Sequence, residues 1–255
     1  LGDILDQALN ALPIPKRMRW ADREDAFVRP VHWLVMLFGD QVVPLSRFGI
    51  EAGRETYGHR FHHPQAITVE SPQDYVSQLA QTGYVIAETA LRREMIESQV
   101  NAAANTLAGE AVINPALLDE VTGLVEWPVP VLGEMDPDFL DLPPEVITLT
   151  MKTHQKYFAV RDPKTGQLVS KFVTIANQVA PDGGVAIAAG NARVLSARLS
   201  DARHFWDNDR KTPLWDETGE RPDMYSQLAK VTFHEELGTV ADKVERVAAL
   251  ARELA

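Results

Sequence analysis

The alternation of apolar and polar residues divides the chain into short strands and longer helices. Apolar residues at helical spacing predict an amphipathic helix over residues 1–12. The apolar run 31–38 is followed by a Gly-Asp turn and predicts a hairpin with a second strand at residues 42–43. Another short strand is expected at residues 67–69.

Two further helices are predicted to begin at a serine or asparagine that is followed by proline. Ser71 precedes Pro72, and Asn114 precedes Pro115. Between them, residues 88–107 are rich in the helix formers Ala, Glu, Arg and Met and predict a longer helix.

The second half of the chain changes character near residue 180. Residues 144–153 predict a helix, and the alternating segments 157–160 and 168–175 predict a hairpin. From residue 185 onwards the pattern is helical throughout. The pattern therefore indicates a mixed α/β part followed by a helical part.

Composition and charge limit what this sequence can encode. The 255 residues are 45% hydrophobic and 24% charged, ordinary values that exclude disorder over most of the length. The absence of cysteine excludes disulfides and thiolate zinc sites. The formal net charge is −11, so any contact with a nucleic acid must come from a local basic patch.

The remaining pattern gives no indication of a membrane helix and predicts one surface connection. No apolar run approaches the about 20 residues of a membrane helix, and the N-terminus lacks a signal-peptide pattern. Residues 134–145 contain several acids and prolines and predict a solvated connection rather than a metal site. The sequence starts without methionine and stops inside a helical pattern, so we expect it to be part of a longer protein.

The first candidate site is the segment GHRFHH at residues 58–63. Arginine can bind an anion through two parallel N–H groups, and imidazoles bind metals or transfer protons. His59, Arg60 and His62 are therefore candidate ligand contacts. The spacing differs from the i, i+4 histidine pair of zinc proteases. As a strand, the segment would place alternate side chains on opposite faces. The alternative is a polar strand edge with partly buried histidines.

The second candidate site is the segment MKTHQKYF, which contains Lys152, His154 and Lys156. It lies at a predicted helix-to-strand junction, where polar groups can surround the mouth of a pocket. The alternative is a polar turn before a core strand.

The third candidate is the helical stretch 190–206, with Arg193 and Arg198 in a locally basic surrounding. Such a face can contact an RNA backbone or another subunit. The alternative is a core helix with a salt-bridged outer face. Its predicted apolar face consists of Val194, Leu195, Leu199, Ala202, Phe205 and Trp206.

A fourth segment runs from Trp20 to Trp33. Arg29 and His32 are candidate functional residues there, but entry into a buried strand explains Phe27 and Trp33 equally well. The sequence contains no phosphate-binding GxxxxGK[ST], no GxGxxG after a strand, no GxSxG and no HExxH. Nothing in it forms an ATP site of its own.

Several segments together resemble a known family. In order between residues 19 and 247 they are RWADREDAFVRPVHW, TYGHRFH, LLDEVTGLVEWPVPVLGEMDPDFLDLPPEVITLTMKTHQKYFAV, GNARVLSARLSDARHFWDNDRK and LGTVADKVERV. They resemble the beta subunit of the bacterial, heterotetrameric glycyl-tRNA synthetase. The resemblance implies that the chain is the N-terminal part of such a subunit.

The resemblance also implies a fold, of the α/β (α+β) class. Residues 1–22 would form an N-terminal helix and lead-in. Residues 23–180 would form a mixed-sheet domain similar to the B3/B4 editing-type domain of the phenylalanyl enzyme's beta subunit. Residues 181–255 would be helical and begin an HD-type domain, whose His-Asp metal pair would lie further along. No metal is expected within this stretch.

For activity, the resemblance implies a cytoplasmic α2β2 ligase, an aminoacyl-tRNA synthetase of protein biosynthesis. Its alpha subunit would bind ATP, Mg²⁺ and glycine, and its beta subunit would handle tRNA(Gly) for glycyl-tRNA aminoacylation. We therefore expect no catalytic residue, cofactor or membrane contact in this stretch. Candidates for contact with the acceptor arm or the alpha subunit are Arg60, Lys152, Lys156 and Arg198.

The sequence is also compatible with two other roles. The first is an editing hydrolase that acts on mischarged tRNA, which needs a pocket with an anchored water or nucleophile beside His59, His62 or His154. Glycine is the smallest amino acid, so its enzyme can exclude larger ones sterically and needs editing less. The second is a purely structural partner of the alpha subunit.

Overall fold

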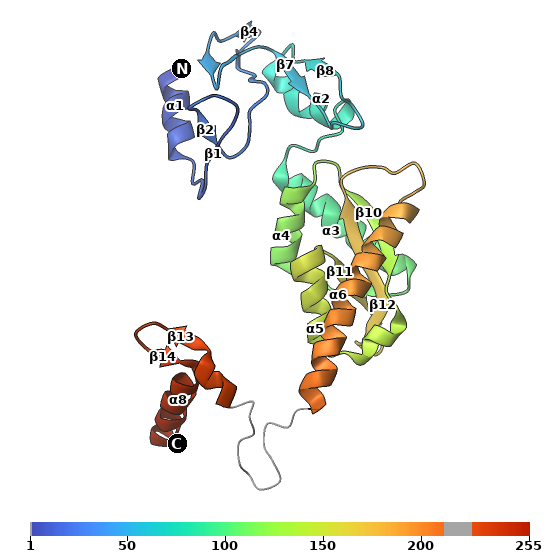
Figure 1. Cartoon of the computed structure of the whole chain (residues 1–255). Helices are drawn as coiled ribbons and strands as arrows, with labels where there is room; N and C mark the ends of the chain where they lie inside the picture. Colours follow the sequence, from blue (N-terminus) through green and yellow to red (C-terminus); the bar gives the residue numbers. More distant parts are fainter. Residues whose placement is uncertain (1, 212–225) are drawn as a thin grey trace.

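The computed structural model describes residues 2–211 and 226–255, which form three regions (Figure 1). The N-terminal region consists of small hairpins between two helices. Its elements are α1 (Gly2–Ala11), β1 (Met18–Arg19), β2 (Ala26–Phe27), β3 (Leu37–Phe38), β4 (Gln41–Val42), β5 (Ser46–Arg47), β6 (Ile50–Glu51), β7 (Glu55–Tyr57), β8 (Ala66–Thr68), the 3₁₀ turn η1 (Pro72–Asp74) and α2 (Tyr75–Gln81).

The central region is built on one antiparallel sheet of four strands in the order β10-β12-β11-β9. Its elements are α3 (Thr89–Thr106), β9 (Glu110–Ala111), α4 (Pro115–Leu124), β10 (Val129–Glu134), η2 (Pro137–Asp141), α5 (Pro144–Thr150), the π-helical turn η3 (Met151–Gln155), β11 (Phe158–Arg161), β12 (Leu168–Ala176) and α6 (Val185–Lys211). The C-terminal region contains η4 (Leu228–Lys230), β13 (Thr232–His234), β14 (Gly238–Thr239) and α8 (Val240–Leu254).

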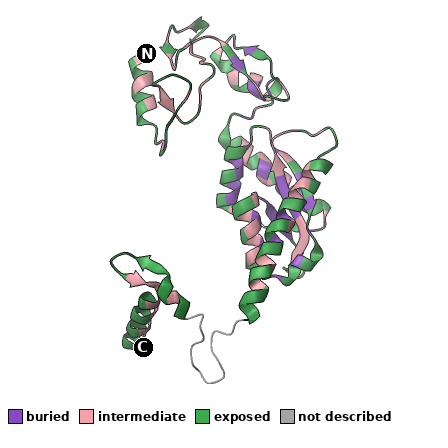
Figure 2. Ribbon diagram, viewed as in Figure 1, coloured by how far each residue is buried: buried purple, intermediate pink, exposed green. Residues whose placement is uncertain are grey.

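Helices cover both faces of the central sheet, because its strands are apolar on both sides. In β11, Phe158 packs against α3 and α4, whereas its neighbour Ala159 faces α5 and α6. The central strand β12 alternates in the same way, with Val173 in the first core and Phe172 in the second. The buried residues of the molecule are concentrated in this region (Figure 2).

A close approach fixes the register of β10 against β12. Gly133 pairs with Phe172, and a Cβ at Gly133 would lie 2.1 Å from the Phe172 ring. The ring fills the space that glycine leaves and stacks on Tyr157, with ring centroids 4.6 Å apart. This stack forms the centre of the core between the sheet and α6.

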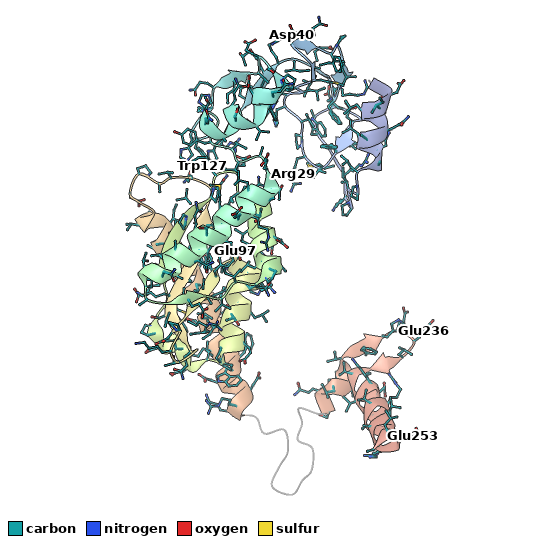
Figure 3. The ribbon with its side chains drawn as sticks, turned by 180° about the vertical axis from the view of Figure 1, so that it is seen from behind. Arg29, Asp40, Glu97, Trp127, Glu236 and Glu253 are labelled. Atoms are coloured by element: carbon teal, nitrogen blue, oxygen red, sulfur yellow. The ribbon has the colours of Figure 1, made fainter. Side chains whose placement is uncertain are left out.

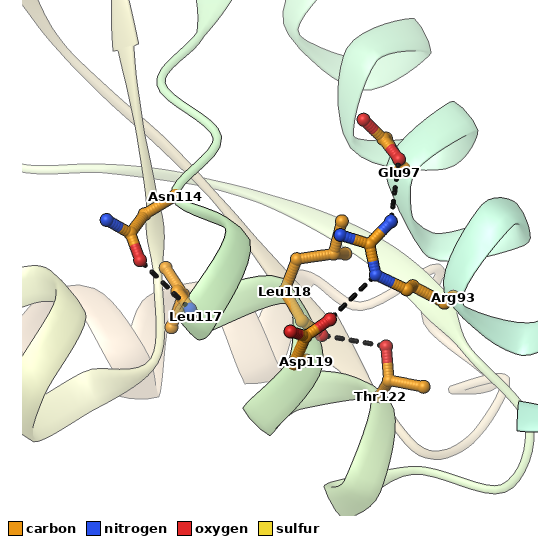
Figure 4. Close-up of polar contacts among 7 residues, drawn as sticks. All are labelled: Arg93, Glu97, Asn114, Leu117, Leu118, Asp119 and Thr122. Atoms are coloured by element: carbon orange, nitrogen blue, oxygen red, sulfur yellow. Dashed lines mark hydrogen bonds and ion pairs between the residues drawn. The ribbon is translucent and has the colours of Figure 1, made fainter. Parts of the chain in front are cut away.

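Polar contacts join α3 to α4 at the surface (Figure 4). Arg93 donates to Asp119 of α4 at 2.7 Å and to Glu97 of its own helix at 3.3 Å. The predicted cap of α4 is confirmed, since Asn114 Oδ1 accepts from the main-chain N–H of Leu117 at 3.2 Å. These contacts hold α4 against α3 and cap its first turn, and the opposite end of α4 leads into the candidate site.

Several predicted elements are confirmed. They are the helix at residues 1–12, the helices after Ser71 and Asn114, the helix at 88–107, and the hairpins at 31–43 and 157–175. In the helix after Ser71, the first turn is 3₁₀ and the serine hydroxyl makes no capping hydrogen bond. The α+β class is confirmed. The sheet, however, is antiparallel throughout rather than mixed.

Other predictions were wrong in specific ways. The run 31–38 is not a buried core strand, because its strand β3 covers residues 37 and 38 alone, Val35 forms an isolated bridge with Gly53, and Phe38 is 76% exposed. The helical pattern after residue 185 is interrupted by the β13–β14 hairpin. Residues 129–134 form edge strand β10, where Pro130 is tolerated.

Helix α6 belongs to the same core as the sheet. Leu195 and Leu199 are fully buried against residues of the central region that include Phe172. These contacts attach α6 to the sheet. In the acidic segment 134–145 the carboxylates are exposed, as predicted, while Phe139 turns inward.

The C-terminal helix α8 begins with a capping box. Thr239 Oγ1 accepts from Asp242 N at 3.2 Å, and Asp242 Oδ2 accepts from Thr239 N at 2.7 Å. These main-chain and side-chain bonds to Thr239 hold the pKa of Asp242 below its ordinary value. Within the ranges that the structure describes, no helix is long and apolar enough to cross a membrane.

Candidate functional site

The histidine segment 58–63 forms a turn where the N-terminal and central regions meet, not a strand edge. It connects β7 to β8, and residues 60–62 are in a turn closed by a hydrogen bond from His63 N to His59 O at 2.8 Å. The predicted alternation of its side chains on two faces is therefore wrong. Gly58 permits the turn to approach α2, since a Cβ there would lie 2.4 Å from Gly83 O.

His59 is 1% exposed and uses both ring nitrogens to bind main-chain groups. Nε2 donates to the carbonyl oxygen of Asn177 at 2.5 Å. Nδ1 accepts from the N–H groups of Phe61 and His62, each at 3.3 Å. A carbonyl on one side and two N–H donors on the other define the tautomer with the proton on Nε2. His59 thus holds the turn in place, and neither nitrogen is free to bind a metal.

His62 has a related role. Its Nε2 accepts from Val179 N at 3.0 Å, just after β12. Its ring lies between those of His59 and Tyr84, with centroid distances of 4.7 Å and 5.1 Å. The two histidines therefore attach the turn to the end of the central strand.

Asn177 is the residue on which these contacts converge. Its Oδ1 accepts from Glu126 N at 2.7 Å and from Trp127 N at 3.0 Å, while its own carbonyl binds His59. Trp127 lies at the junction of the two regions (Figure 3). Its ring meets that of Tyr84 edge-on at 5.2 Å. One asparagine thereby joins the turn, the end of β12 and the segment after α4.

A cavity of about 810 Å³ opens beside this junction. Its walls come from the N-terminal region on one side and from α3, the end of α4 and Asn177 on the other. The lining residues are His32, Trp33, Tyr57, Gly58, His59, Arg60, Phe61, Arg92, Gly123, Leu124, Val125, Glu126 and Asn177.

The two arginines of this cavity differ. Arg92 is held by the chain, since its guanidinium donates to Thr122 O at 2.9 Å and to Ile86 O. Arg60 is exposed and has no hydrogen-bond or ion-pair partner among the residues that the structure describes. Arg60 is therefore free to meet a ligand, and Arg92 contributes its charge from a fixed position.

The second predicted cluster lies elsewhere, at the end of α5. Of the three predicted residues, Lys152 alone lines a cavity of about 390 Å³, together with Glu145 and Tyr157. Burial raises the pKa of Tyr157 to about 12. His154 is exposed and lines neither of these two cavities. Lys156 has a left-handed backbone (φ 58°) and an ion pair with Glu120 at 2.7 Å.

The third cluster, on α6, is exposed. Arg193 and Arg198 point away from the core, and within the described part of the chain neither has an ion-pair partner, so a salt-bridged outer face is not formed there. The predicted apolar face was partly wrong. Val194 is 46% and Phe205 66% exposed, because the buried stripe follows Leu195, Leu199, Ala202 and Trp206 instead.

The structure thus joins His59, Arg60 and His62 but distributes the other predicted residues over separate elements. Sequence analysis missed Asn177 and Arg92, whose roles depend on contacts with distant main-chain groups. Entry into a buried strand was one of the two explanations that the sequence left open for Trp33, whereas the residue is 41% exposed and lines the cavity. Over residues 2–211 and 226–255, no group of three or more His, Cys, Asp or Glu side chains could hold a metal ion.

Comparison with known proteins shows the family to which this chain belongs. The family model "Glycyl-tRNA synthetase beta subunit" matches residues 1–255. Proteins named glycine–tRNA ligase beta subunit from Pseudomonas putida (strain W619), Marinobacter nauticus and Coxiella burnetii (strain Dugway 5J108-111) are 46%, 45% and 44% identical to it. Each match covers 100% of this chain and 36% of the relative.

The chain belongs to the glycyl-tRNA synthetase beta subunit family. It spans about a third of the length of the relatives that it matches.

Proposed function

We propose that this chain is the tRNA-handling, non-catalytic N-terminal part of a glycine–tRNA ligase beta subunit. It supports the ATP-dependent attachment of glycine to tRNA(Gly) at the active site of the alpha subunit, in a cytoplasmic α2β2 enzyme. ATP and Mg²⁺ bind in the alpha subunit. The observation that carries the proposal is the match of the entire chain to proteins named glycine–tRNA ligase beta subunit.

The geometry of the histidine turn supports a binding role over hydrolysis. An editing hydrolase needs a group that can activate or anchor water. Both ring nitrogens of His59 and the Nε2 of His62 are used by main-chain groups. Two of the three histidines that the sequence offered for such chemistry, His59 and His62, therefore support the junction, and the third, His154, is exposed and lines neither of the two cavities.

The free cations support contact with an anionic partner. Arg60, Lys152, Arg193 and Arg198 have no ion-pair partner in residues 2–211 and 226–255, although the chain carries a net charge of −11. Lys156 is paired with Glu120 and is the weakest of the candidates. We propose the other four as contacts with tRNA or the alpha subunit.

The finer fold assignment is also a proposal. A sheet with helices on both faces is compatible with a B3/B4-like domain, and the C-terminal hairpin and α8 are proposed as the beginning of an HD-type domain. The limits at residues 22 and 180 stay predictions. Superposition on the phenylalanyl enzyme's beta subunit tests them.

The functional proposal is tested with the complete beta subunit and its alpha subunit, each purified and then recombined. We expect the beta subunit to raise the affinity of the alpha subunit for tRNA(Gly) and to leave mischarged tRNA(Gly) intact. Hydrolysis of the mischarged tRNA by the beta subunit would establish the editing role instead. Capture of the alpha subunit without any gain in tRNA affinity would establish a purely structural partner.

A further inference from the structure

Three aromatic rings are exposed around the cavity at the junction. The side chains of Trp33, Tyr57 and Phe61 are 41%, 38% and 70% exposed, and all three line the cavity. Exposed aromatic surface gathered at one concave site marks a binding site more often than rings scattered singly over a surface. The volume of about 810 Å³ lies within the range of about 300–1,000 Å³ of small-ligand sites.

Two of these rings form a fixed pair. The centroids of Trp33 and Tyr57 are 4.9 Å apart, and the indole N–H donates to Thr56 Oγ1 at 3.2 Å. Thr56 is itself 1% exposed, so the indole is anchored to a buried residue of β7. Phe61 is less restrained, since its only ring contact in the described part of the chain is His59 at 6.0 Å.

The charge of this cavity differs in sign from that of the whole chain. Arg60 and Arg92 line it, and Glu126 is the acidic residue among the lining side chains. The guanidinium of Arg60 is unpaired, whereas Arg92 is fixed by carbonyl oxygens. A cation beside exposed rings suits a ligand that is flat, aromatic and attached to an anion.

We propose that this aromatic cleft binds an unpaired nucleobase of RNA, stacked between Phe61 and the Trp33–Tyr57 pair, with Arg60 on a neighbouring phosphate. Proteins bind single-stranded nucleotides in this way, because every base offers a π-face and every linkage a negative charge. Paired bases in a duplex cannot enter such a cavity. The inference rests on the proposed function, and it specifies which feature of the RNA this site recognises.

The test uses the complete alpha–beta ligase with tRNA(Gly) and, as a second probe, a fully paired RNA duplex. Phe61→Ala and Phe61→Leu remove the ring, and Phe61→Trp restores one. Phe38→Ala is the matched control, because Phe38 is 76% exposed on the β3–β4 hairpin and does not line the cavity. Each variant is measured for the dissociation constant of both probes.

We expect the loss of the ring to weaken tRNA binding by about 5- to 150-fold, the range for one stacked base. Phe61→Trp and Phe38→Ala keep the wild-type affinity for tRNA, and none of the variants changes binding of the duplex. Arg60→Gln lowers the magnitude of the salt slope of tRNA binding by about 0.7, as expected for one contact with a single strand.

Two results would contradict the proposal that the aromatic cleft binds a nucleobase. One is wild-type tRNA affinity in Phe61→Ala. The other is full tRNA affinity in Phe61→Leu, which would show that an apolar side chain without a ring is sufficient and that Phe61 does not stack on a base. Both results are compatible with the proposed function if the complete ligase still binds tRNA more tightly than the alpha subunit alone. A beta subunit that adds no tRNA affinity would contradict the proposed function itself.

Discussion

His59 and Asn177, 118 positions apart in sequence, are joined by a hydrogen bond from the imidazole Nε2 to the asparagine carbonyl oxygen. The same asparagine accepts two main-chain N–H groups through its side chain. The junction between the N-terminal and central regions therefore depends on side chains that satisfy main-chain groups, namely those of His59, His62 and Asn177. A buried polar group left without such a partner costs free energy, so these residues matter for stability.

Removing the imidazole is expected to loosen the turn. His59→Ala leaves the Asn177 carbonyl and two main-chain N–H groups without their partner. We expect the free energy of local opening of residues 58–63 to fall by about 1–3 kcal/mol. Hydrogen exchange of this segment, followed by mass spectrometry, measures the change.

His154→Ala is the control for that variant. His154 is exposed, so its replacement is expected to change the free energy of opening by less than about 0.5 kcal/mol. If the amide hydrogens of residues 58–63 exchange equally slowly in the His59 and His154 variants, the imidazole of His59 does not hold the turn.

Asn177 is expected to tolerate aspartate better than alanine. Asn177→Asp keeps a side-chain oxygen that can accept from Glu126 N and Trp127 N, whereas Asn177→Ala leaves both N–H groups unpaired. Exchange of these two amides should therefore accelerate in the alanine variant and change less in the aspartate variant. Equal acceleration in both would mean that the acceptor oxygen is not what protects the segment.

Two glycines near the cavity are expected to respond oppositely to alanine. At Gly58 a Cβ would lie 2.4 Å from the main-chain oxygen of Gly83, so Gly58→Ala must displace backbone and is expected to cost about 1–3 kcal/mol. At Gly123, inside α4, a Cβ meets no atom within 4 Å. Gly123→Ala is expected to stabilise the protein by up to about 1 kcal/mol. Thermal unfolding of the two variants measures the contrast, and destabilisation by both would contradict it.

Local signals explain which elements were predictable. The helix after Asn114 was predicted correctly, because its start depends on a side chain that binds its own first turn. The hairpin at residues 157–175 was likewise visible in the alternation around a loop. In both cases the residues that decide the structure are neighbours in the sequence.

Other features depend on contacts that the sequence pattern does not contain. Phe205 has the spacing of a core residue, but the side chains of α6 that pack in the core are those of Leu195, Leu199, Ala202 and Trp206. Phe205, which precedes Trp206, is therefore exposed. Asn177 is an ordinary polar residue at a strand end until the segment after α4 is placed beside it. His59 and His62 suggested chemistry by their residue type, whereas their partners are distant main-chain groups. Local patterns cannot show such partners.

Acid is expected to weaken the beginning of α6. Asp182 accepts from Ala186 N at 2.8 Å and from Gly184 N at 3.0 Å, and these bonds hold its pKa below the ordinary value of 3.8. Because the pKa is lower in the folded state, the stabilisation is complete above about pH 3.8 and is lost as the pH falls through the folded value. The difference in melting temperature between the wild type and Asp182→Ala should therefore be largest near neutral pH. A difference that persists unchanged at pH 2 would show that the carboxylate charge has no part in the cap.

The most direct test of the proposed function is tRNA(Gly) binding by the complete ligase as a function of salt, with Arg60, Lys152, Arg193 and Arg198 each reversed to glutamate. We predict weaker binding and a salt slope smaller in magnitude by about 0.7–0.9 for each phosphate that the variant no longer neutralises. The KM values for ATP and glycine should stay unchanged. Wild-type affinity and slope in all four variants would contradict the role of this chain in handling tRNA.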